Sequence, residues 1–222
     1  MSSDNIVFQV ATWLIPLVIA IVLHEISHGW VANAFGDPTA RRKRRLSLNP
    51  IRHIDPVGTI VLPLILAVSG APVFGWAKPV PVVARRLRNP RVHMMLVALA
   101  GPAMNLLLAM IGALAWAGLR WLSPPEGLGW DFLILNVFNF VVINVSLAIF
   151  NLLPIPPFDG GHVVEGLLPR PLALRYARLG RYGFFLLFAL LVLLPMANIH
   201  IVSAIIGPPI GLLLRLLGLP LD

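Results

Sequence analysis

The chain of 222 residues is 58% hydrophobic, has a mean hydropathy of +0.87 and contains only 12% charged residues. These values lie outside the range of soluble globular domains, in which about 25% of residues are charged. They exclude a soluble enzyme and predict an integral membrane protein, because several apolar stretches approach the roughly 20 residues that a helix needs to cross a bilayer core. The chain has no cysteine, which excludes disulfides and thiolate metal sites.

The net charge of +8 is concentrated in three clusters. All Lys and Arg residues except Arg120 and Arg215 lie within residues 41–52, 78–91 and 170–181. Each cluster adjoins an apolar segment, which is typical of loops on the cytoplasmic side of a membrane. The first apolar segment therefore has its N-terminus outside and its end at the cytoplasm. No aromatic-interleaved basic module supports nucleic-acid binding, so we expect the lipid bilayer and no nucleic acid as a partner.

The apolar stretches predict an all-α polytopic membrane protein with about five to six transmembrane helices. The long segments, in chain order, are residues 6–35, 92–119 and 132–153. Residues 58–69 are apolar but brief, so they form either a short span or a re-entrant hairpin.

Near the C-terminus, residues 184–206 and 210–219 are interrupted by Pro195 and by Gly207-Pro208-Pro209. They form either two spans or one span and a partial helix. Nothing in the chain is large enough for a separate soluble domain. We therefore expect a single domain over residues 1–222, with a core of about 6–165 and C-terminal helices within 183–219.

The stretch from Phe74 to Val82 reads FGWAKPVPV. A residue that precedes proline avoids the helical region, so this stretch is expected to be extended. A strand with proline-blocked donors is typical of a sheet edge. We therefore expect a small β element on the cytoplasmic side near residues 45–85. It either pairs with an unwound substrate segment or only covers a loop at the membrane surface.

The motif HExxH, residues His24 to His28, lies near the end of the first apolar segment. Two histidines four apart on a helix share one face, so both imidazoles can reach one metal ion. Glu25 follows the first ligand directly and is placed to activate a metal-bound water. Ionisable residues are costly inside a membrane segment, which favours a chemical role for the motif.

A catalytic zinc has three protein ligands and keeps a fourth position for water. Asp159 is a candidate third ligand, because it follows the span that returns to the cytoplasm and precedes two glycines that allow close backbone approach. Taken alone, it could equally be a turn aspartate. Asp55 and Glu165 lie on the same side and remain alternatives. His162, three residues after Asp159, is a candidate to support a ligand.

Four stretches together resemble the site-2 proteases, a family of intramembrane zinc metalloproteases, in a compact form without PDZ or CBS domains. They are HExxH at 24–28, the segment at 74–82, Gly-Pro-Ala-Met-Asn at 101–105, and residues 151–161 ending in Asp-Gly-Gly. The resemblance implies that His24, His28 and Asp159 hold one zinc ion per chain and that Glu25 is the catalytic base.

The resemblance also implies that Asn105 lies close to the site, where it could hold an oxyanion or only join helices. It assigns the reception of an unwound substrate to Gly75, Trp76, Ala77, Lys78, Pro79 and Val80. The implied activity is endoproteolysis of membrane proteins within or near their transmembrane helices, in a bacterial cell membrane with the site near the cytoplasmic face.

Three other functions remain as alternatives. A metal-ion transporter should carry acidic residues on several spans, and these are almost absent here. A membrane di-iron oxygenase needs more histidine clusters than one HExxH among six His provides. A catalytically silent homologue could serve as a membrane scaffold, but every residue required for the chemistry is present.

Overall fold

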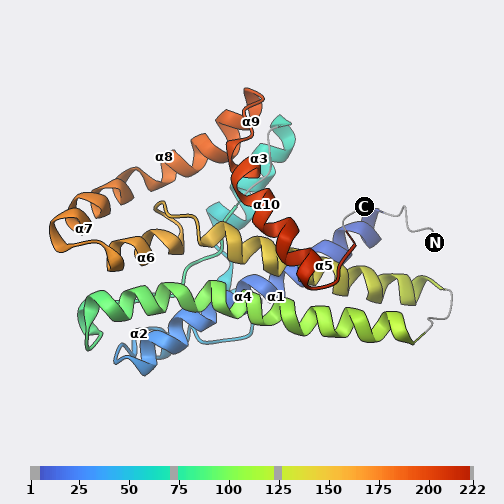
Figure 1. The fold of residues 1–222 in the computed structure, drawn as a ribbon, viewed down its shortest axis with the longest axis horizontal. Coiled ribbons are helices and arrows are strands. Elements are labelled where there is room, and N and C mark those ends of the chain that lie inside the picture. The colour runs from blue at the N-terminus through green and yellow to red at the C-terminus, as the bar shows by residue number, and fades with distance from the viewer. Residues whose placement is uncertain (1–5, 71–74, 123–126, 221–222) are drawn as a thin grey trace.

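The computed structural model describes residues 6–70, 75–122 and 127–220, and over these residues it is all-helical (Figure 1). Three long helices, α1 (Ile6–Ala34), α4 (Pro90–Trp121) and α5 (Leu128–Asn151), pack against one another and form the body of the molecule. The shorter α-helices are α2 (Thr39–Arg42), α3 (Leu62–Ser69), α6 (Asp159–Leu167), α7 (Arg170–Ala177), α8 (Gly183–Phe188), α9 (Leu194–Met196) and α10 (Ile201–Leu216). The other helical turns are η1 (Pro50–His53), η2 (Pro56–Val61), η3 (Ala84–Arg86), η4 (Arg178–Tyr182) and η5 (Ala189–Leu193).

Small side chains occupy the contacts among the long helices. Ala20 of α1, Ala109 of α4 and Ala148 of α5 are fully buried. Small residues let membrane helices approach closely, so that backbone and polar groups of neighbouring helices come within reach of one another. The helix α6 packs against α4, and α10 packs against α5. The site described below lies where α1, α4, α5 and α6 meet.

Local sequence signals set the start of several helices. Asn89 accepts a hydrogen bond from the amide of Val92, and Pro90 supplies the first residue of α4. Asp55 accepts hydrogen bonds from the amides of Val57 and Gly58 at 3.1 and 2.8 Å, and so begins η2. A polar cap followed by proline is the expected start of a helix, because proline lacks the amide that the first turn leaves unpaired.

Four helices of the described residues are long and apolar enough to cross a membrane: Ile6–Ala34, Pro90–Trp121, Leu128–Asn151 and the continuous run Arg170–Met196. This confirms an integral membrane protein, but the expected count of five to six spans is too high for these residues. Pro56–Ser69 and Ile201–Leu216 are apolar helices of fewer than 18 residues. A 16-residue helix is about 24 Å long, shorter than the roughly 30 Å hydrocarbon core.

The predicted break at Gly207-Pro208-Pro209 is wrong. The helix α10 runs from Ile201 to Leu216 through both prolines. The interruption lies earlier, where Asn198 has a φ of 59° and the chain turns between α9 and α10. Asparagine adopts this left-handed conformation more readily than most residues, and apolar helices in membranes tolerate internal proline.

The predicted β element is also wrong for the residues that the structure describes. Residues 50–53 and 56–61 form helical turns and residues 62–69 form α3, whereas residues 75–83 belong to no helix or strand. Phe74 lies outside the described residues. The amides of Trp76 and Lys78 donate to the carbonyls of Gly58 and His53 at 3.1 and 2.8 Å. These acceptors belong to η2 and η1, so no neighbouring strand is present to form a ladder.

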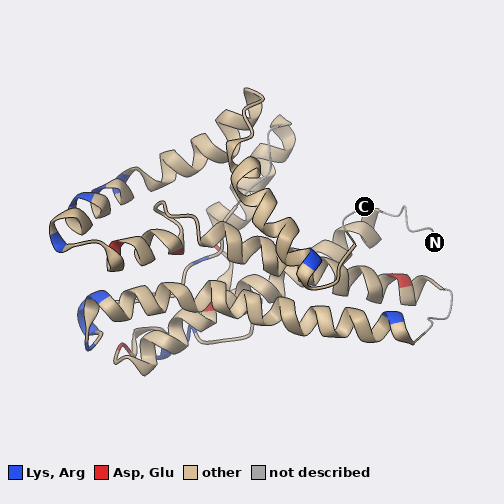
Figure 2. Ribbon diagram, in the orientation of Figure 1, with Lys and Arg blue, Asp and Glu red and all other residues tan. Residues whose placement is uncertain are grey.

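Basic residues gather at one end of the molecule. Figure 2 shows Lys and Arg at the start of α4, around α2 and along α7, which all lie at the left of the view. Arg120 lies in the last turn of α4, and α4 ends at the opposite end of the body (Figure 1). A bundle with its positive charge at one end fits the distribution expected for a membrane protein with that end in the cytoplasm.

Candidate metal centre

His24 and His28 lie one turn apart on α1 and turn the same ring nitrogen toward each other. Their Nε2 atoms are 3.1 Å apart, and the two rings meet at an interplanar angle of 88°. Both side chains are buried. Gly101 of α4 leaves the space for them, because a Cβ there would lie 2.6 Å from His24 Nε2 and 2.6 Å from His28 Cε1. Any larger residue at this position would displace the rings.

Asp159 brings a carboxylate to the same point from α6. Its Oδ2 lies 3.3 Å from His24 Nε2 and 3.5 Å from His28 Nε2. Asp159 is the first residue of α6, and Gly160 packs so closely on the end of α5 that a Cβ would collide with the carbonyl oxygens of Leu152 and Leu153. The two glycines after Asp159 thus allow the start of α6 to seat against α5, which aims the carboxylate at the histidines.

The hydrogen bonds of the other ring nitrogens determine which atoms carry protons. His28 Nδ1 lies 2.7 Å from the carbonyl oxygen of Val97, which can only accept, so Nδ1 donates. His24 Nδ1 lies 2.6 Å from Asn105 Oδ1, the acceptor end of an amide. Each neutral imidazole therefore has its proton on Nδ1 and a lone pair on Nε2.

In these neutral forms three ligand atoms face one another: His24 Nε2, His28 Nε2 and Asp159 Oδ2. Asp159 Oδ2 is buried and has no hydrogen-bond donor among the described residues. In a tetrahedral zinc site with zinc–nitrogen distances of about 2.0–2.1 Å, neighbouring ligand atoms are about 3.3 Å apart. The distances of 3.1, 3.3 and 3.5 Å match that spacing. The residues present fit a zinc ion, which would relieve the repulsion among the three lone pairs.

Glu25 faces the irregular segment of residues 75–83. The amide of Val80 donates to Glu25 Oε2 at 2.8 Å. Val80 also crosses α1 closely, since a Cβ on Gly29 would lie 2.9 Å from Val80 Cγ1. The neighbours of Val80 are Pro79 and Pro81, which have no amide proton. Val80 is thus the one residue of this Pro-Val-Pro sequence that can hold the Glu25 carboxylate.

A second carboxylate holds the end of the same segment. Asp37, fully buried just after α1, accepts hydrogen bonds from the amide of Val83 at 2.6 Å and from the amide of Thr39 at 3.0 Å. Burial alone would raise the pKa of the Asp37 carboxyl. The hydrogen bonds from Thr39 and Val83, together with Arg86 at 3.9 Å, hold this pKa below its ordinary value. Asp37 is therefore ionised at neutral pH.

The other candidates from the sequence lie apart from this triad. Asp55 uses Oδ1 to cap η2, and Glu165 lies on α6 beside His162 at 3.4 Å. Both members of the latter pair are exposed, with 47% of the His162 side chain and 41% of the Glu165 side chain accessible. Asn105 is close to the site, but its Oδ1 faces His24 and its Nδ2 faces Asn144, which favours a role in holding a ligand over one in holding an oxyanion.

Sequence reasoning missed Asn144, Asp37 and the Val97 carbonyl. Asn144 is fully buried on α5, and its Oδ1 accepts from Asn105 Nδ2 at 2.8 Å. The available signal was a polar side chain within an apolar span, which is costly unless it is paired. A backbone acceptor such as the Val97 carbonyl has no sequence signal at all.

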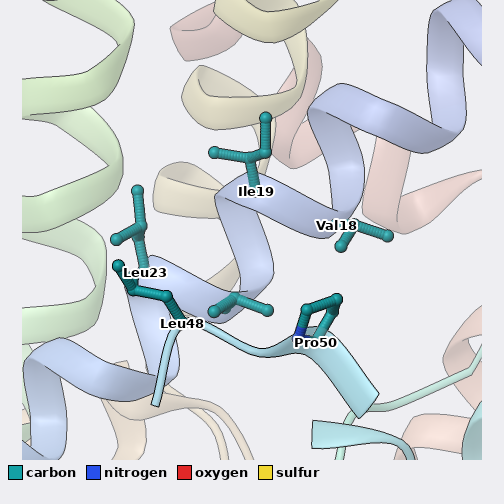
Figure 3. A pocket seen from close by; sticks show the side chains of 6 residues that line it. Val18, Ile19, Leu23, Leu48 and Pro50 are labelled. Atoms are coloured by element: carbon teal, nitrogen blue, oxygen red, sulfur yellow. The ribbon is translucent and has the colours of Figure 1, made fainter. Parts of the chain in front are cut away.

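An apolar groove of about 250 Å³ runs along α1 beside the loop that follows α2 (Figure 3). Its lining consists of Val18, Ile19, Val22, Leu23, Leu48 and Pro50. Val22 and Leu23 directly precede His24, so the groove extends along α1 as far as the motif. It suits acyl chains or apolar side chains and offers no group for chemistry.

Comparisons with known proteins agree with this geometry. The sequence model of peptidase family M50 matches residues 128–194. The chain is 39% identical over 185 residues to the Bacillus subtilis protein named "Putative zinc metalloprotease YwhC", with 81% of this chain and 79% of the relative covered. It is 30% identical over 187 residues to the Mycolicibacterium smegmatis protein named "Putative zinc metalloprotease Rip2". This match covers 84% of this chain and 67% of the relative.

The Rip2 protein of Mycobacterium tuberculosis strain H37Rv is 32% identical over 161 residues, which cover 72% of this chain and 56% of the relative. No solved structure matches the chain. The identity and coverage of the Bacillus and Mycolicibacterium relatives are high enough to show the family. The chain therefore belongs to peptidase family M50, the site-2 protease family of zinc-dependent metalloproteases.

Proposed function

We propose that the chain is an intramembrane endopeptidase that hydrolyses peptide bonds within or near transmembrane segments of other membrane proteins. The observation that carries the proposal is the convergence of three ligand atoms, His24 Nε2, His28 Nε2 and Asp159 Oδ2, among helices long and apolar enough to cross a membrane. They would hold one zinc ion per chain. When bound, zinc would supply an acidified water and polarise the scissile carbonyl.

Glu25 would act as the general base and then as the general acid. The Val80 amide holds Oε2 of the carboxylate at 2.8 Å, which leaves Oε1 to take a proton from the attacking water. The same proton is then delivered to the nitrogen of the leaving amine. Because Val80 has prolines on both sides, the position of Glu25 depends on this single amide.

The segment from Gly75 to Val80 would receive the substrate. A transmembrane helix has its carbonyls occupied by internal hydrogen bonds, so it must unwind before a carbonyl can be attacked. The amides of Trp76, Lys78 and Val80 are already used within the chain, and Pro79 has none. The opposite edge of the segment therefore carries the amides of Gly75 and Ala77 together with carbonyls, and an unwound substrate would pair with these groups.

We further propose that the active site lies near the cytoplasmic face of a bacterial cell membrane and that the N-terminus is outside. Two observations support this orientation. The basic residues lie at the end of the molecule where α1 ends and α4 begins, and the His-Glu motif is in the second half of α1 (Figure 2). The relatives described above come from bacteria.

Cleavage of a defined membrane substrate tests the proposal. The chain would be reconstituted in lipid vesicles with a single-span reporter whose helix contains a glycine-proline pair near its cytoplasmic end. We expect the unmutated chain to cut within the span, as mapped by mass spectrometry, and Glu25→Gln to abolish cleavage while zinc remains bound. Unchanged cleavage by Glu25→Gln would contradict the proposal. Zinc binding without cleavage of any membrane reporter would favour a silent scaffold.

A further inference from the structure

We infer that Asn144 is a positioning residue for the metal centre: acting through Asn105, it fixes the His24 tautomer that leaves Nε2 free for zinc. This inference rests on the proposed zinc site. Neither asparagine reaches the three converging atoms, and their effect passes through the far nitrogen of the His24 ring. Asn144 lies on α5, Asn105 on α4 and His24 on α1, so one hydrogen-bonded chain crosses the three long helices.

The direction of each hydrogen bond from Asn144 to His24 follows from the bond that Asn144 makes to the backbone. Asn144 Nδ2 donates to the carbonyl oxygen of Phe140 at 2.8 Å, and a carbonyl can only accept. Asn144 must therefore turn Oδ1 toward Asn105, which donates to it from Nδ2 at 2.8 Å. Asn105 in turn must present Oδ1 to His24, and His24 Nδ1 must carry the proton.

The hydrogen-bonded series from Asn144 through Asn105 to His24 is buried along its whole length, so water cannot replace any of these side chains. Asn105 and Asn144 are fully buried, and His24 is 7% exposed. The only other acceptor that the described residues offer to Asn105 Nδ2 is the carbonyl of Ala20 at 3.4 Å, which is near the limit for a hydrogen bond. Asn144 therefore supplies the stronger constraint on the orientation of the Asn105 amide.

The two histidines differ in how their tautomers are fixed. His28 donates directly to the backbone carbonyl of Val97, which cannot turn over. His24 depends on an amide that can rotate by 180° and present a donor in place of an acceptor. If the amide of Asn105 turned over, His24 would move its proton to Nε2 and lose its lone pair for zinc. The tautomer of His24 is thus more easily reversed than that of His28.

Zinc affinity of the purified full chain, measured by competition with a fluorescent zinc chelator, tests the inference without recourse to proteolysis. Asn144→Leu keeps a similar side-chain size but removes the acceptor for Asn105. We expect its affinity for zinc to fall by about 10–100-fold, the usual cost of losing a partner of a ligating histidine. Asn144→Asp keeps an acceptor oxygen for Asn105 and, as a neutral buried acid, can still donate to the Phe140 carbonyl. We expect its affinity to lie within about threefold of the unmutated chain.

Asn139→Leu is the matched control. Asn139 is buried on the same helix, and its Nδ2 joins α5 to α1 through the carbonyl of Thr12 at 2.9 Å, with no contact to His24. If Asn144 acts only by joining helices, both leucine variants should lose similar zinc affinity and thermal stability.

Three outcomes would count against the inference. Zinc binding by Asn144→Leu at the unmutated affinity would overturn it and leave the metal centre intact. Equal losses in Asn139→Leu and Asn144→Leu would overturn it as well. Failure of the unmutated chain to bind zinc would overturn both the metal centre and the inference, so the failure of either proposal is recognised by a different measurement.

Discussion

The two sides of the site are built in different ways. On one side, side chains from α1, α4, α5 and α6 pack together, and the polar groups around the metal position are hydrogen-bonded or converge on it. On the other side lies the segment of residues 75–83, which has no regular structure and is held by its amides, two of which donate to carboxylates.

This difference implies that the two sides of the site serve different functions. Packed helices fix ligand positions to within fractions of an ångström, because closely packed side chains cannot shift independently. A segment held by single hydrogen bonds can exchange those bonds for others at modest cost. We therefore expect changes on the helical side to affect metal binding, and changes on the segment side to affect turnover or stability with zinc still bound.

The largest effect is expected on the helical side, from Gly101→Ala. The added Cβ would collide with both imidazoles, so the rings must separate and their Nε2 atoms can no longer bind one metal ion together. We expect zinc affinity to fall by about 100-fold or more in chelator competition. Gly118→Ala is the control, because it lies on the same helix and its added Cβ would meet nothing within 4 Å. Similar zinc affinity in the two variants would contradict the described packing.

The next largest effect is expected from Val80→Pro, on the segment side. Proline removes the amide that holds Glu25 Oε2, and a hydrogen bond to a charged group contributes about 1.5–3 kcal/mol. We expect the cleavage rate to fall by about 10–100-fold with zinc content unchanged. Val82→Pro removes an amide of the same irregular segment that lies outside the substrate-receiving stretch and does not contact Glu25, so it should reduce cleavage far less. Loss of zinc in Val80→Pro would show that the segment side also contributes to metal binding.

A smaller effect is expected from Asp37→Asn, and it should depend on pH. The folded-state pKa of Asp37 is below its ordinary value, so its carboxylate stabilises the fold at neutral pH. That stability should diminish as pH falls below the ordinary value and vanish below the folded-state pKa. We expect the variant to be less stable by about 1–3 kcal/mol at pH 7 and the difference to narrow toward acidic pH.

Thermal unfolding in detergent from pH 7 to the acid limit would measure this difference. Asp131→Asn, a change at an exposed residue in the first turn of α5, should leave the pH dependence as in the unmutated chain. A constant difference between Asp37→Asn and the unmutated chain at all pH values would contradict the assigned charge state.

The smallest effect is expected outside both sides, from Tyr176→Phe. The Tyr176 hydroxyl donates to the carbonyl of Pro154 at 2.7 Å and ties α7 to the proline-rich loop before Asp159. Loss of one such bond costs about 0.5–1.5 kcal/mol. We expect the unfolding temperature to fall by a few degrees with zinc affinity unchanged. A marked loss of zinc would mean that this loop, and not α6 packing, sets the position of Asp159.

The sequence predicted the helical side better than the segment side, for physical reasons. His24, Glu25 and His28 lie within one helical turn, so spacing alone predicts that both histidines share a face. Joining them to Asp159 required the resemblance to the site-2 proteases, since local patterns do not report the distance between separate elements. The membership of that family is confirmed by the comparisons.

The predictions that failed also depended on contacts between separate elements or on a single backbone conformation. The prolines at 79 and 81 indicated an extended backbone correctly enough to exclude a helix, but they carry no information on the partner, and the partners are turns and carboxylates instead of a strand. Asn144 was overlooked because its role depends on where Asn105 lies, on another helix. The break before α10 depends on one left-handed residue, Asn198, whereas the stronger Gly-Pro-Pro signal begins nine residues later.

The metal content of three purified chains tests the central claim most directly. The account predicts about one zinc per chain for the unmutated protein, a marked loss for Asp159→Ala, and no change for Glu165→Ala, whose side chain lies beside His162 outside the triad. Full zinc occupancy at unchanged affinity in Asp159→Ala, or loss of zinc in Glu165→Ala, would contradict the assignment of Asp159 as the third ligand.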